Sequence, residues 1–130
     1  MFPVLGEIPQ RFWNPYLGRV GVLYQGWRVT IEVLSEDLGD QQVFDGLPLR
    51  GLTFETAGSE AGSILIEAGD GPNFTIHRVG QPWRVQGAQV RPGREPDLLI
   101  DSEDGTATLV ELRSFFALPP GTDDETQEPR

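Results

Sequence analysis

The chain has 130 residues, of which 20 are acidic and 10 are basic, so its formal net charge at pH 7 is −10. All of the basic residues are arginine, lysine and cysteine are absent, and His77 is the single histidine. These absences exclude a P-loop lysine, a Schiff base, a thiolate nucleophile, a disulfide and a metal site built from several histidines or cysteines. We therefore expect no cofactor and no metal.

At roughly 100–200 residues per domain, the length fits one domain, which we expect to span residues 1–116. Residues 117–130 contain two adjacent prolines and four acids against one arginine, which is typical of a flexible, solvated tail. The first ten residues have neither a basic segment nor a long apolar run. We therefore expect a cytoplasmic protein that does not enter a membrane. The negative charge disfavours nucleic acid as a partner.

Residues 8–26 contain the only stretch with helical periodicity. Pro15 suits the first turn of a helix, where its missing N–H has no intrahelical partner, and Asn14 is a good N-cap. The pattern predicts a short turn from Pro9 and then a helix from about Pro15 to Tyr24 that ends near Gly26. Its apolar face comprises Phe12, Trp13, Tyr16, Leu17, Val20, Leu23 and Tyr24.

From Trp27 onward the apolar residues alternate with polar ones, which predicts strands. The parity of the alternation reverses at Gly51, which indicates a bulge or bend there. Ser102–Gly105 is a strong hairpin turn. We expect about seven short antiparallel strands near 27–33, 47–54, 64–66, 74–79, 83–90, 98–101 and 107–113. The fold class is mainly β (α+β), with the N-terminal helix capping a small bent barrel of Sm-like or SH3-like architecture and a C-terminal hairpin added.

Several short segments, taken in order, resemble a bacterial family of unknown function, domain of unknown function 5335. The resemblance extends from about Glu7 to Ser114 and implies a cytoplasmic bacterial domain, without an established activity. The segments are Ile8-Pro9, Trp13, Gly26-Trp27, Val29–Val33, Leu47-Pro48-Leu49 with Gly51, Thr75-Ile76-His77, Asp104-Gly105-Thr106 and Leu109-Val110.

His77 is the weak candidate for acid–base chemistry, since its ordinary pKa lies near neutrality. It shares a strand face with Thr75, and we expect that face to be in solvent, which favours an incidental role. The acids around Asp101, Glu103 and Asp104 do not match the spacing of a calcium loop.

The aromatic residues carry most of the expected structural roles. Trp13, Trp27 and Trp83 each begin or anchor an element, and we expect all three in the core. Phe115 and Phe116 follow the last strand, and adjacent strand residues point to opposite faces. One of them is therefore expected outside the core, as an interface candidate for a homo-oligomer, most simply a two-fold dimer.

The leading hypothesis is a non-catalytic, oligomeric small-barrel module for interaction or binding. The alternative is a carboxylate-based hydrolase or a small-molecule-binding enzyme subunit, which needs two acids converging in a pocket. A third hypothesis, an Sm-like RNA binder, is opposed by the net charge and needs the strand arginines to gather on one face. A deep pocket that holds His77 or paired carboxylates would favour the enzyme, whereas an extensive apolar interface without such a pocket would favour the module.

Overall fold

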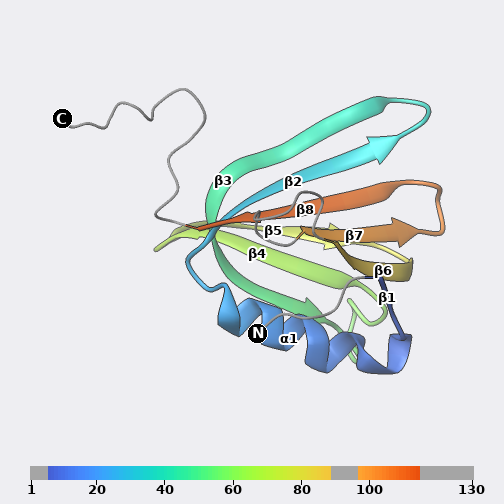
Figure 1. Cartoon of the computed structure of the whole chain (residues 1–130), viewed down its shortest axis with the longest axis horizontal. Coiled ribbons are helices and arrows are strands. Elements are labelled where there is room, and N and C mark those ends of the chain that lie inside the picture. Colours follow the sequence, from blue (N-terminus) through green and yellow to red (C-terminus); the bar gives the residue numbers. More distant parts are fainter. Residues whose placement is uncertain (1–5, 89–96, 115–130) are drawn as a thin grey trace.

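The computed structural model describes residues 6–88 and 97–114, which form a helix and one antiparallel sheet (Figure 1). A 3₁₀ turn (Gln10–Phe12) leads into α1 (Trp13–Leu23). The strands are β1 (Gly6–Ile8), β2 (Arg28–Ser35), β3 (Gly39–Phe54), β4 (Ile64–Asp70), β5 (Asn73–Val79), β6 (Pro82–Ala88), β7 (Asp97–Ser102) and β8 (Ala107–Arg113). Their order across the sheet is β1-β6-β7-β8-β2-β3-β4-β5. The mainly β fold with a preceding helix is as predicted.

The sheet does not close into a barrel, so the Sm-like or SH3-like closure expected from the sequence is wrong. Its two edges are β1 and β5. Closure fails at the corner between β5 and β6, where Gln81 adopts a positive φ of 50°. The carbonyl of Gln81 accepts a hydrogen bond of 2.9 Å from the Glu103 amide in the β7–β8 turn. This corner directs β6 away from β5, so that β6 pairs with β1 and β7 instead.

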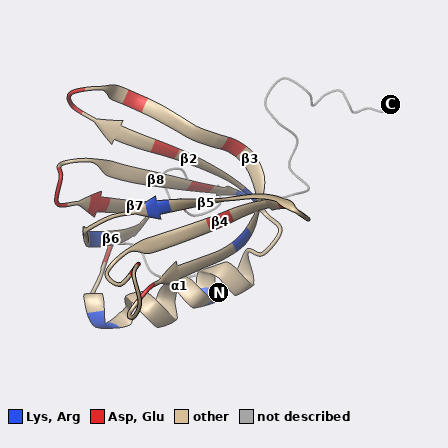
Figure 2. Cartoon of the chain, turned by 180° about the vertical axis from the view of Figure 1, so that it is seen from behind, with Lys and Arg blue, Asp and Glu red and all other residues tan. Residues whose placement is uncertain are grey.

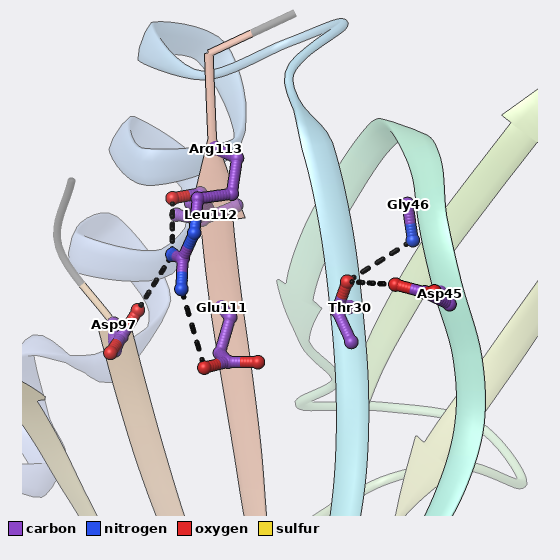
Figure 3. A network of polar contacts seen from close by, with 7 residues as sticks. All are labelled: Thr30, Asp45, Gly46, Asp97, Glu111, Leu112 and Arg113. Carbon is purple, nitrogen blue, oxygen red and sulfur yellow. Dashed lines mark hydrogen bonds and ion pairs between the residues drawn. The ribbon is translucent and has the colours of Figure 1, made fainter. Parts of the chain in front are cut away.

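The long strand β3 joins the two halves of the sheet. Its first part pairs with β2 and its second part with β4. The bend predicted at Gly51 is confirmed, because the register with β4 shifts between Leu49 and Gly51. Between β2 and β3, the Thr30 hydroxyl donates a hydrogen bond to Asp45 Oδ1 at 3.0 Å and accepts one from the Gly46 amide at 3.1 Å (Figure 3). These contacts hold β3 against β2 where that register also slips.

Helix α1 packs against β3 and runs along one side of the sheet in Figure 1. It begins two residues before the predicted start, with Pro15 inside its first turn, where a proline is tolerated. Its buried face presents Trp13, Leu17 and Val20, with exposed fractions of 2% or less. The Trp13 indole donates a hydrogen bond of 2.8 Å to the Ile8 carbonyl and meets the Phe54 ring edge-on at 5.2 Å.

Two of the three tryptophans occupy the expected place. Trp13 is buried and Trp27 is partly buried against the core. The core role expected for Trp83 is wrong, since 51% of it is exposed. The pairing of β6 with β7 slips between Pro82 and Arg84, and the Arg84 guanidinium lies 4.8 Å from the indole centroid. Phe115, Phe116 and the tail 117–130 lie outside the described residues.

Candidate ligand-binding site

An open cavity of about 430 Å³ lies between the end of edge strand β5 and the β7–β8 turn. Its volume falls in the range of small-molecule sites, roughly 300–1,000 Å³. The lining comes from strands β2, β5, β7 and β8, from the connection between β5 and β6, and from the β7–β8 turn. The lining residues are Val33, His77, Arg78, Val79, Gly80, Gln81, Ser102, Asp104, Thr106 and Thr108.

Two residues of the lining with hydroxyl groups, Ser102 and Thr108, stand at strand positions whose alternation places them on the buried face. Ser102 follows Leu98 and Ile100 on β7, and Thr108 precedes Val110 and Leu112 on β8, in each case with the same parity. Ser102 is 5% exposed and Thr108 is 3% exposed. Among the described residues, neither hydroxyl has a hydrogen-bond partner. Both hydroxyl oxygens keep some solvent contact through the open cavity. A ligand in the cavity could therefore replace their water contacts with direct hydrogen bonds, each worth about 0.5–1.5 kcal/mol.

His77 lies on the inner face of β5, opposite Ile66 of β4, which is fully buried. The expectation that this face is in solvent is therefore wrong for His77, which is half-buried, while Thr75 on the same face is exposed. Burial lowers the pKa of His77 below its ordinary value of 6.5, so the imidazole is neutral at pH 7. A neutral imidazole has one N–H donor and one nitrogen acceptor. No side chain of the described segments forms a hydrogen bond with it.

The charged groups of the lining already have partners. Asp104 accepts hydrogen bonds from the Thr106 amide at 2.9 Å and the Thr106 hydroxyl at 2.7 Å. These two bonds hold the pKa of Asp104 below its ordinary value. Arg78 Nε lies 2.6 Å from Glu60 Oε1. The charge of Arg78 is therefore paired, whereas Asp104 keeps its negative charge, because the groups that donate to it are neutral.

The lining does not bring together the groups that hydrolysis needs. Asp104 is the one carboxylate among the described lining residues. Two acids on the strands are already in ion pairs, Glu67 with Arg50 at 3.3 Å and Glu111 with Arg113 at 3.3 Å. Within residues 6–88 and 97–114, no group of three or more His, Asp or Glu side chains is placed to hold a metal ion.

Four of the strand arginines bind neighbouring acids, namely Arg50, Arg78, Arg84 and Arg113, so Arg28 alone among the described strand arginines has no ion pair. Figure 3 shows the guanidinium of Arg113 between Asp97, at 3.4 Å, and Glu111. Arg84 Nε lies 2.7 Å from Asp101 Oδ2. Viewed from behind, the described part of the sheet carries acidic residues on several strands and at the hairpin turns (Figure 2). The contacts therefore lend no support to phosphate binding by these arginines.

The comparison with protein families returns one match. A family of unknown function, DUF5335, matches residues 4–121. The chain belongs to this family. No curated protein and no solved structure matches the DUF5335 chain. No helix in the described part of this DUF5335 domain is long and apolar enough to cross a membrane. A cytoplasmic location stays a prediction.

The site in this DUF5335 chain could have been suspected from polar residues at strand positions that alternate with the core. Ser102, Thr108 and His77 are polar residues that share the parity of the buried Ile100, Val110 and Val79. A polar residue at a core position requires a partner inside the fold or a ligand. Only the tertiary structure shows that these three positions, on three strands, line one cavity.

Proposed function

We propose that this DUF5335 domain is a non-catalytic binding module for a small, uncharged, polar ligand that occupies the open cavity. The main support is a pair of largely buried residues, Ser102 and Thr108, whose hydroxyls line the cavity and have no hydrogen-bond partner within the described chain. A few polar groups in the wall of a cavity of this size are what orients a small polar ligand.

The cavity disfavours an anionic ligand because the one charge of its described lining without an opposite partner is the Asp104 carboxylate. The carboxylate of Asp104 is held by Thr106, and the Arg78 guanidinium is held by Glu60. Burial keeps His77 neutral at pH 7. An anionic ligand would lose hydration and meet the negative Asp104 without gaining a free cation, which is unfavourable. A sugar, a nucleoside or a small amide matches the free donors and acceptors.

Binding is favoured over catalysis because no nucleophile–base pair is assembled. The described chain contains no hydrogen bond between His77 and a serine or threonine hydroxyl. Triad-type and acid-pair mechanisms both depend on such a mutual contact. His77 then acts as a donor or acceptor towards the ligand.

The experiment is a binding screen by two-dimensional NMR with an isotope-labelled chain. The panel contains four neutral compounds, which are ribose, adenosine and two acetamide-type fragments. It also contains two phosphorylated counterparts, ribose 5-phosphate and adenosine monophosphate. We expect neutral compounds to shift the amide signals of residues 77–81 and 102–108. Signals that move only with the phosphorylated compounds, or only outside these two segments, would contradict the proposal.

A matched pair of variants tests the hydroxyl itself. Thr108→Val keeps the shape of the side chain and removes its hydrogen-bonding capacity, so affinity is expected to fall by about 3–30-fold. Thr53→Val makes the same change on an exposed part of β3 outside the cavity and is expected to leave affinity unchanged. Equal binding by both variants would remove Thr108 from the site.

A further inference from the structure

Strand β5 presents a free edge of seven residues. It pairs on one side with β4, in continuous register from Asn73 to Val79, and no described strand pairs with its other side. The opposite edge of the sheet, β1, has only three residues. An unpaired strand of this length offers a row of backbone donors and acceptors to another chain.

The protection of β5 as an edge strand is limited to one charged residue, Arg78, whose charge is paired with Glu60. The strand contains no proline and no bulge, and the sequence contains no lysine. Its outer face carries two large apolar residues, Phe74 with 47% exposure and Ile76 with 51% exposure. The more apolar residues of β5 therefore face outward, while His77 and Val79 face inward.

The sequence of β5 is suited to pairing with itself. If two copies meet antiparallel about a two-fold axis at Ile76, all seven residues of each strand are paired. Ile76 then meets Ile76 of the second copy, and Phe74 lies opposite Arg78 of the second copy on the same face. An apolar contact and two aromatic–guanidinium contacts result, and no like charges are placed directly opposite each other.

The charge around this edge allows a second copy to approach despite the net charge of −10. The two arginines on this face are already balanced by two glutamates. Arg50 binds Glu67 and lies 4.5 Å over the Phe74 ring, and Arg78 binds Glu60. The surface at β5 is therefore locally neutral, which removes most of the repulsion between copies at this place.

We propose that β5 is the dimer interface of this protein, formed by antiparallel β5–β5 pairing with a second copy about an axis at Ile76. This moves the expected interface from Phe115 and Phe116, which lie outside the described residues, to the edge of the sheet. The proposal does not depend on the cavity or on its ligand.

The first test measures the mass in solution by light scattering over a range of concentrations. The wild-type chain is expected at twice 14.4 kDa. Ile76→Arg places two positive charges at the axis and is expected to weaken dimerisation by at least roughly 30-fold. Val22→Arg makes the same charge change on α1, where the side chain is 76% exposed, and should remain dimeric. Far-UV circular dichroism verifies that both variants are folded.

The second test uses the absence of cysteine. Ile76→Cys places the only thiols of the dimer at the axis, so mild oxidation is expected to yield a covalent dimer, whereas Val22→Cys is expected to stay monomeric on a denaturing gel. A wild-type chain that is monomeric at all concentrations overturns the proposal and leaves the edge to a different partner. A dimer that survives Ile76→Arg, or that cross-links as well through Val22→Cys, also overturns it.

Discussion

Helix α1 and strand β3 approach each other most closely at Gly21. A Cβ atom added to Gly21 would lie 3.1 Å from the amide nitrogen of Leu52 and 3.6 Å from the Cα of Gly51. Gly18, one turn earlier on the same helix, has nothing within 4 Å of such a Cβ. The two glycines thus share a helical backbone and differ in what a methyl group would meet.

The expected effects of Gly→Ala at the two positions have opposite signs. In an exposed helix interior, alanine is favoured over glycine by roughly 0.8–1 kcal/mol, so Gly18→Ala should raise the free energy of unfolding by about that amount. At Gly21 the same gain is offset by overpacking against backbone atoms of β3, which typically costs about 1–3 kcal/mol. Gly21→Ala should therefore lower the free energy of unfolding by up to about 2 kcal/mol.

Urea denaturation of the wild-type chain and of both variants measures this difference, with circular dichroism as the signal. We expect the two variants to differ by about 1–3 kcal/mol, or roughly 3–10 °C in Tm for a chain of this size. A Gly21→Ala variant stabilised as much as Gly18→Ala would refute the reasoning, because it would show that helix and strand are further apart than the structure has them.

Two further predictions concern the core and the cavity. Trp13→Phe removes the donor to the buried Ile8 carbonyl and part of the ring, so it should cost about 2–4 kcal/mol of stability. The control Trp83→Phe, at a half-exposed position, should change stability by less than about 0.5 kcal/mol in urea denaturation. If both variants lost the same free energy of unfolding, the hydrogen bond and the burial of Trp13 would not contribute to stability as argued. His77, as the single histidine, gives one NMR titration, whose midpoint should lie below 6.5 because burial disfavours the charged ring. As the pH falls, the unfolded chain protonates His77 before the folded chain does. The contribution of His77 to the free energy of unfolding is therefore complete above pH 6.5 and declines as the pH falls below that value. That decline should be absent in His77→Gln, and a midpoint at or above 6.5 would contradict the assignment to the inner face.

Local patterns in the sequence were sufficient for most of the elements. The spacing of Trp13, Leu17 and Val20 predicted the helix, whose core face they form. Alternation predicted most of the strands, and the reversal at Gly51 predicted the bulge. These features depend on neighbouring residues, which is why sequence alone can determine them. The first part of β3 was missed, because its residues 39–42 are polar and exposed and the strand is held there by pairing with β2.

The tertiary structure decided which face of β5 is buried and whether the sheet closes. Alternation places Phe74 and Ile76 on one face and His77 on the other, but it does not say which face is the core. The tight turn after Asp70 fixes the register of β5 on β4, so His77 follows Ile66 inward, although Ile76 is more apolar. Likewise, the corner at Gln81 is held by Glu103, which is distant in the sequence. That long-range contact lies where the chain turns away from β5 into β6. Both the unpaired edge of β5 and the cavity beside Gln81 therefore depend on residues that are far apart in the sequence.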